Sequence, residues 1–167
     1  IIITHSHYDH IKYLDDFIYY YPNIQICCHE ESKKLYSPNN IKSLGDNEVV
    51  MLGEILIISI FTPGHYHDSI CYWIKNDNLL FTGDTMFVGR TGRTISNTSN
   101  ISELYDSIYE KIFKLPENTK ILPGHHYGYI PSITIKENKS ISAFFQCNSL
   151  QDFKKIMAKF EENYKKK

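Results

Sequence analysis

The chain has 167 residues, of which 42% are hydrophobic and 22% charged, the ordinary balance of a globular domain that buries a core. Its formal net charge of −1 provides no overall field for nucleic acid or an anionic membrane, and no apolar stretch reaches the roughly 18 residues that a membrane span needs. We therefore expect one domain over residues 1–167 with neither nucleic acid nor a membrane as its partner, and no oligomeric state is predicted.

The first part of the chain predicts short elements around a histidine-rich motif. The β-branched run Ile1–Thr4 favours a buried strand, and the motif at residues 5–10 leads into a helix. The apolar face of that helix is formed by Ile11, Leu14, Phe17 and Ile18. A strand, a short helix and a loop are predicted next, at residues 24–28, 30–36 and 37–40.

The middle of the chain predicts two hairpins and a long loop. The first hairpin joins residues 48–52 to 54–61 through Gly53, and the second joins residues 70–74 to 79–81. Residues 83–100 are rich in glycine, serine, threonine and asparagine, which indicates a long and functional loop.

The last third of the chain predicts helices around one strand. An amphipathic helix over residues 101–115, capped by Asn100 or Ser102, precedes a strand at residues 119–122. Two further helices are predicted, at residues 134–141 and 149–164. The order of strands and helices favours an α/β fold, either alternating or in αββα layers.

The cysteines offer no metal or disulfide framework. Cys27 and Cys28 are adjacent, Cys71 and Cys147 are distant, and no pair has the two-residue gap of a redox or zinc motif. We interpret them as reduced core thiols, which predicts a cytoplasmic protein.

Seven of the eight histidines fall in three short motifs, each directly after a predicted strand. The motifs contain His5, His7 and His10; His65 and His67; and His125 and His126. Asp9 and Asp84 lie in the same kind of loop. Histidine is the commonest metal ligand and carboxylate its usual companion, so the pattern predicts a metal centre.

The spacing within the motifs indicates which residues would bind the first metal ion and which would face a second. His5 and His7 are two residues apart, which points both rings the same way on extended backbone. Asp9 and His10 come at the turn into the helix and face a second ion, which Asp84 could bridge to the first at about 3.5–4 Å. Gly64 and Gly124 let the backbone approach closely before His65 and His125. The remaining histidines are expected to line the pocket or face solvent (His67, His126) or to be structural or exposed (His29).

Four strings, in this order, resemble the metallo-β-lactamase superfamily. They are Thr-His-Ser-His-Tyr-Asp-His (4–10), Thr-Pro-Gly-His (62–65), Phe-Thr-Gly-Asp-Thr-Met-Phe-Val-Gly-Arg-Thr-Gly-Arg-Thr (81–94) and Leu-Pro-Gly-His-His-Tyr-Gly (122–128). The chain is most similar to the glyoxalase II-like hydrolases and the persulfide dioxygenases. The resemblance implies an αββα sandwich with metals at the sheet edges. It also implies strands before the first motif, so we expect a chain truncated at its N-terminus.

By matching position, the resemblance implies two zinc ions. One would be held by His5, His7, His65 and Asp84, and the other by Asp9, His10, Asp84 and His125. A hydroxide between the metals would attack the carbonyl of a small thioester such as an S-hydroxyacylglutathione, with Asp9 orienting it as the catalytic residue. Arg93 and Tyr127 match substrate-binding positions for the glutathione part, with Arg90 near them. Arg93 could instead order its loop through a salt bridge.

The sequence leaves alternatives open. A persulfide dioxygenase acting on glutathione persulfide would use one iron, held by His5, His65 and Asp84, and the short segment after His125 favours that reading. A third hypothesis is a metal-binding module without catalytic activity. A β-lactamase is disfavoured, because relatives with that activity usually carry cysteine where Asp84 stands. Relatives also carry Thr-Pro-Gly-Ser where this chain has residues 66–69, so His67 and Asp68 are expected at the pocket rim.

Overall fold

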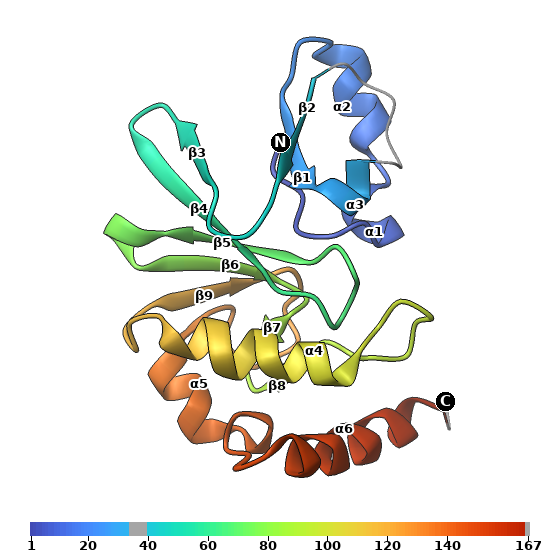
Figure 1. Ribbon diagram of the computed structural model, residues 1–167, viewed down its shortest axis with the longest axis vertical. Helices are drawn as coiled ribbons and strands as arrows, with labels where there is room; N and C mark the ends of the chain where they lie inside the picture. The colour runs from blue at the N-terminus through green and yellow to red at the C-terminus, as the bar shows by residue number, and fades with distance from the viewer. Residues whose placement is uncertain (34–39, 166–167) are drawn as a thin grey trace.

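The computed structural model describes residues 1–33 and 40–165, which form helices at both ends of the chain and a run of strands between them (Figure 1). The α-helices are α1 (Tyr8–Ile11), α2 (Leu14–Tyr20), α3 (Glu30–Lys33), α4 (Ile101–Asp106), α5 (Ile135–Ile141) and α6 (Leu150–Lys165). The strands are β1 (Ile26–His29), β2 (Ile41–Leu44), β3 (Val49–Leu52), β4 (Ile55–Phe61), β5 (Ile70–Ile74), β6 (Leu79–Gly83), β7 (Met86–Phe87), β8 (Arg90–Thr91), β9 (Lys120–Pro123) and β10 (Ile133–Thr134).

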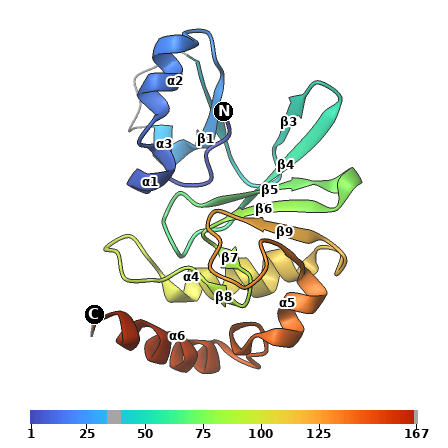
Figure 2. The ribbon, with the colours of Figure 1, turned by 180° about the vertical axis from the view of Figure 1, so that it is seen from behind.

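A six-stranded mixed sheet forms the centre, in the order β10-β9-β6-β5-β4-β3. The strands β3 to β6 pair antiparallel to their neighbours, whereas β6 and β9 pair in parallel. The strands β4, β6 and β9 therefore run in the same direction, and their carboxyl ends lie at one edge of the sheet. A separate parallel pair, β1 and β2, lies with α1 to α3 on the other side of this sheet from α4, α5 and α6 (Figure 1, Figure 2).

Successive side chains of the central strands point to opposite faces of the sheet, and this divides the core into layers. On β5, Ile70 and Tyr72 pack in a cluster with Cys27 and Leu44 of the β1–β2 pair, whereas Cys71 faces the opposite cluster. Successive side chains of a strand point to opposite faces, so a sheet buried on both faces shows this pattern. A third cluster, which includes Leu14 and Ile26, joins α2 to the outer face of β1. These clusters give four layers, which confirms the predicted αββα sandwich.

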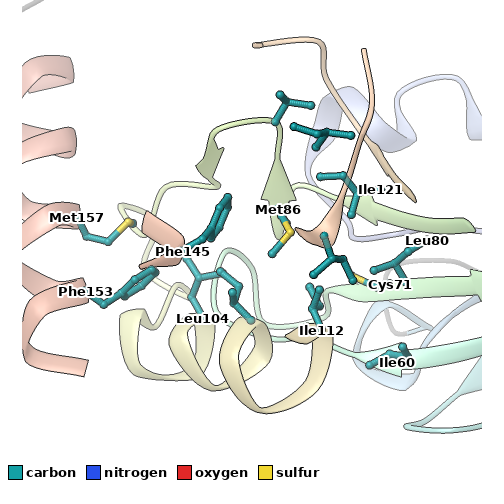
Figure 3. Close-up of a cluster of buried hydrophobic side chains, with 14 residues drawn as sticks. Ile60, Cys71, Leu80, Met86, Leu104, Ile112, Ile121, Phe145, Phe153 and Met157 are labelled. Carbon is teal, nitrogen blue, oxygen red and sulfur yellow. The ribbon is translucent and has the colours of Figure 1, made fainter. Parts of the chain in front are cut away.

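The largest cluster lies between the six-stranded sheet and the helices α4 and α6 (Figure 3). Leu104 of α4 and Phe153 and Met157 of α6 are fully buried in it, and Leu80 and Ile121 belong to the same cluster from the sheet. Burying each such side chain contributes about 1.5–3 kcal/mol, so this cluster is a main source of stability for the face that carries α4.

Both predicted hairpins are confirmed, and the differences from prediction lie elsewhere. The expected strand at residues 1–4 is a single parallel bridge between Ile2 and Cys27, because the oxygen of Thr4 accepts from the Ile70 nitrogen at 2.8 Å instead. The expected helix after the motif is broken into α1 and α2, and its apolar face is uneven, since Leu14 is buried and Phe17 is half exposed.

The helix expected over residues 101–115 is regular only in α4, where the Asn100 side chain accepts from the nitrogens of Ser102 and Glu103. It widens to a π-helical stretch at Ser107–Lys111 and tightens to a 3-10 turn at Ile112–Lys114. Apolar periodicity does not distinguish these helical forms. The strand β2 and the short β7–β8 hairpin were not predicted, and residues 34–39 of the expected short helix and loop lie outside the described residues.

Among the described residues, no helix combines the length and the apolar character that crossing a membrane requires. Three of the four cysteines are buried (Cys27, Cys28 and Cys71), as expected for core thiols.

Candidate metal centre

The sheet gathers the histidine motifs at one edge. His65 follows β4, Asp84 follows β6 and His125 follows β9, and these three strands run in the same direction. The first motif reaches the same edge because the Thr4 oxygen accepts from the nitrogen of Ile70, at the start of β5. The fold thus brings together all seven of the expected ligands.

One group of ligand atoms belongs to His5, His7 and His65. The Nε2 of His5 lies 2.9 Å from Nδ1 of His7, and the Nε2 of His65 lies 3.1 Å from that same atom. These atoms lie within 4.8 Å of one another, as do those of a second grouping formed by His5, His10 and Asp84.

A further group belongs to Asp9, His10 and His125. The Nε2 of His125 lies 3.2 Å from that of His10 and 3.2 Å from Oδ2 of Asp9. Asp84 stands between this group and the first, because its oxygens lie 3.4 Å from His10 Nε2, 3.7 Å from His65 Nε2 and 3.6 Å from His125 Nε2.

The chemistry of this cluster fits divalent metal ions. Five ring nitrogens and two carboxylates converge from four loops, and imidazole with carboxylate suits zinc and iron alike. The Oδ1 atom of Asp84 is buried without a hydrogen-bond partner among the described residues, although His10 lies near it. A buried acceptor of this kind is rare unless a cation or water satisfies it, so the residues present fit the implied metals.

Burial sets the protonation of the innermost ligands. It lowers the pKa of His5 to about 2, and the neighbouring His10 adds to this effect. Burial also lowers the pKa values of His7 and His65. Burial alone would raise the pKa of Asp84, but His10 and the other histidines beside it bring that pKa below the ordinary value. At neutral pH His5, His7 and His65 therefore offer neutral imidazoles and Asp84 an ionised carboxylate, the forms that bind metals. His10 differs, because burial lowers its pKa but the neighbouring Asp84 and Asp9 raise it above the ordinary value.

Contacts behind the ligands fix their orientation. The Nδ1 of His65 donates to the carbonyl oxygen of Arg93 at 2.7 Å, which leaves Nε2 to face the centre. The Nδ1 of His5 contacts Oγ1 of Thr4 at 3.1 Å. A methyl group on Gly124 would lie 2.6 Å from Oδ1 of Asp84, so the close backbone approach predicted there is present.

A pocket of about 80 Å³ opens beside the centre. His65 and Asp84 form its inner wall, and the predicted substrate contacts Arg93 and Tyr127 line it as well. The guanidinium of Arg90 lies over the ring of Tyr127, 3.8 Å from its centroid. The structure thus brings both predicted contacts to one pocket, while their role toward substrate stays a prediction.

The histidines outside the ligand set are placed as follows. His126 is exposed, and His67 is half buried against the ring of Tyr66. His29 is buried and stacks on Phe61 with ring centroids 4.1 Å apart, which is a structural role.

The expectation that Asp68 lies at the pocket rim is wrong. Asp68 is 1% exposed, because its carboxylate accepts hydrogen bonds from two segments that cover it. The sequence also gave no reason to place the C-terminal helix at the pocket. Phe160 of α6 lines it, and Glu161 accepts from the nitrogen and hydroxyl of Thr94, next to Arg93. For α6 no local pattern in the sequence indicated a place at the pocket. For Asp68 the sequence offered one signal, its departure from the Thr-Pro-Gly-Ser that relatives carry at residues 66–69.

The comparisons with known proteins agree with this geometry. The sequence model of the metallo-beta-lactamase superfamily matches residues 1–125. The chain is 28% identical over 158 residues to the probable polyketide biosynthesis zinc-dependent hydrolase PksB of Bacillus subtilis (strain 168), which covers 93% of this chain and 69% of that protein. It is 34% identical over 127 residues to the hydroxyacylglutathione hydrolase of Francisella tularensis subsp. novicida (strain U112), which covers 76% of this chain and 49% of that protein.

Among solved structures, ETHE1 from Myxococcus xanthus superposes with a TM-score of 0.83 at 30% identity, over 94% of this chain and 67% of that one. The chain therefore spans about half the length of the hydroxyacylglutathione hydrolase and about two thirds of the other two proteins.

The fold and the cluster define a class of αββα proteins whose candidate metal centre lies at the ends of the central strands. The chain belongs to the metallo-β-lactamase superfamily, which confirms the resemblance found in its motifs.

Proposed function

We propose that the protein is a metal-dependent hydrolase of thioesters, with an S-hydroxyacylglutathione as the type of substrate and two zinc ions as cofactors. The observation that carries the proposal is the position of Asp84, whose two oxygens contact ligands of both histidine groups. A shared carboxylate between two ligand sets is the arrangement expected of a two-metal site. The relatives named as a zinc-dependent hydrolase and a hydroxyacylglutathione hydrolase support both the reaction type and the metal.

The metals, when bound, would supply a Lewis acid and a water activated at neutral pH. The protein's own side chains would then orient the reactants. The side chain of Asp9 is 56% exposed and its Oδ2 lies 3.2 Å from Nε2 of His125, so its other oxygen would be available to hold a proton of the attacking water. Arg93 and Tyr127, on the wall that also contains His65 and Asp84, would hold the remote part of the substrate. Because a thiolate is a good leaving group, no strong acid is needed opposite Asp9.

A second candidate is an iron-dependent persulfide dioxygenase acting on glutathione persulfide. The observation that favours it is burial: His5, Asp84 and His65 are 1%, 9% and 8% exposed, whereas the side chains of Asp9 and His125 are 56% and 31% exposed. A buried triad of two histidines and one carboxylate is the ligand set of non-haem iron oxygenases.

Elemental analysis of protein purified without added metal, followed by two assays, separates the candidates. The hydrolase predicts about two zinc ions per chain and release of thiol from an S-hydroxyacylglutathione. The dioxygenase predicts about one iron per chain and oxygen uptake with glutathione persulfide. Protein that binds metal and performs neither reaction would contradict both proposals and support a metal-binding module.

Substitution of Glu161 tests the substrate pocket separately from the metal centre. Glu161 holds the segment of Arg93 through Thr94, whose nitrogen and hydroxyl lie 2.6 and 2.9 Å from its Oε1. A hydrogen bond to a charged group contributes about 1.5–3 kcal/mol, and this one is partly exposed. We therefore expect Glu161→Gln to raise the KM for thioester by roughly 3- to 10-fold with unchanged metal content. The exposed neighbour provides the control variant, Glu162→Gln. Equal kinetics in the two variants would show that α6 does not position Arg93.

A further inference from the structure

The structure contains a buried carboxylate next to the metal centre that belongs to neither ligand group. Asp68 is 1% exposed and lies three residues after His65, in the loop between β4 and β5. Burial of a carboxylate is costly unless several donors satisfy it, so its contacts need an explanation.

Asp68 accepts hydrogen bonds from two separate segments. The backbone nitrogen of Ser6 donates to both of its oxygens, at 3.2 Å to Oδ1 and 3.1 Å to Oδ2. The hydroxyl of Ser32 in α3, itself 1% exposed, donates to Oδ2 at 2.6 Å. All of these groups are donors, which is the environment of an ionised carboxylate.

The partner Ser6 stands between two candidate ligands, His5 and His7. Asp68 therefore connects the loop that carries these two histidines to the loop that carries His65. Among the residues that the structure describes, one backbone hydrogen bond, from the Ile70 nitrogen to the Thr4 oxygen at 2.8 Å, joins the same two segments nearby. All three histidines of one ligand group thus depend on a junction that has Asp68 at its centre.

The negative charge of Asp68, like its hydrogen bonds, favours metal binding by the neighbouring histidines. Among residues 1–33 and 40–165, no lysine or arginine forms an ion pair with it. A negative charge buried beside the histidine cluster favours a cation there, because buried charges are screened less than exposed ones.

We infer that Asp68 is a positioning residue of the metal centre: it holds the His5–His7 loop against the His65 loop and strengthens metal binding by their three imidazoles. The inference rests on the assignment of these histidines as ligands, which is part of the proposed function. It does not depend on which reaction the centre catalyses.

The test measures metal affinity directly, with Zn²⁺ in competition with a chelator and Co²⁺ as a spectroscopic probe. Asp68→Asn keeps the size of the side chain and an oxygen for the Ser6 nitrogen but removes the charge, whereas Ser32→Ala removes one donor and keeps the charge. Loss of a partner behind the ligands typically lowers metal affinity by about 10- to 100-fold. We expect roughly 10-fold weaker Zn²⁺ binding in Asp68→Asn, a smaller loss in Ser32→Ala, and an altered Co²⁺ absorption spectrum in both. The exposed Asp77 provides the matched control, Asp77→Asn, with no change.

Two results would overturn the inference. One is wild-type Zn²⁺ affinity and an unchanged Co²⁺ spectrum in Asp68→Asn. The other is metal-free Asp68→Asn that has lost its circular dichroism while the metal-free wild type is folded, since Asp68 would then serve folding and not the geometry of the centre. A wild type that binds Zn²⁺ tightly and performs neither proposed reaction would contradict the proposed function and leave the inference standing.

Discussion

Replacing Asp84 with alanine is expected to abolish most metal binding and activity, the largest functional effect of any single substitution in this chain. Asp84 is 9% exposed, and its oxygens lie within 3.7 Å of ligand nitrogens on His10, His65 and His125. Breaking a buried charge pair costs about 3–5 kcal/mol. Since each 1.4 kcal/mol is a factor of ten, metal affinity should fall by roughly 10²- to 4 × 10³-fold.

The measurement is metal content by elemental analysis after dialysis, together with the rate of thioester hydrolysis or oxygen uptake. Asp84→Asn separates charge from shape, because it keeps an oxygen ligand and removes the negative charge. The exposed Asp106 of α4 provides the control, Asp106→Asn. If Asp84→Ala retained its metal and its activity, Asp84 would not be the shared ligand, and the two-metal proposal would fail.

The sequence predicts the candidate centre better than it predicts the elements that carry it. His5, His65 and His125 each follow a run that predicts a strand, and this prediction needs the existence of the strands and not their exact bounds. For that reason the prediction of the metal centre is unaffected although residues 1–4 form a single bridge at Ile2 and the expected helix is broken into α1 and α2. The common direction of β4, β6 and β9, which brings their carboxyl ends to one edge of the sheet, comes from the structure.

The parts that could not be predicted depend on long-range packing. Phe160 and Glu161 lie more than sixty residues after Arg93, and α6 meets that segment only because its apolar face packs on Leu104 and neighbouring residues of the large cluster. Asp68 is similar, since its two partners lie 62 and 36 residues before it. No local pattern distinguishes a buried aspartate that joins loops from an exposed one at a pocket rim.

The largest effect on stability is expected from Gly64, which lies between Pro63 and His65. Its φ of +132° is strained for any residue with a side chain, and a methyl group there would lie 2.2 Å from the backbone nitrogen of Leu104. Leu104 is fully buried in the large cluster, and the Asn100 nitrogen that precedes α4 donates to the Gly64 oxygen at 2.8 Å. Neither the loop nor the first turn of α4 can move away without opening the core.

Gly64→Ala is therefore expected to lower the free energy of unfolding by about 3–5 kcal/mol, from backbone strain of about 1–3 kcal/mol and overpacking of similar size. For a domain of this size that corresponds to a fall in Tm of roughly 6–20 °C, measured by thermal unfolding with the metal removed. Metal affinity should fall as well, because the displaced residue is joined to His65.

A second glycine separates the two contributions. Gly53, in the turn between β3 and β4, also has a positive φ, of +59°, but a methyl group there would meet nothing within 4 Å. Gly53→Ala therefore measures backbone strain alone and should cost about 1–2 kcal/mol without changing metal affinity. If Gly64→Ala cost no more than Gly53→Ala, the contact between Gly64 and the first turn of α4 would not be as close as the structure places it. The position of His65 would then have to be set by its bond to Arg93 and not by packing against the helix.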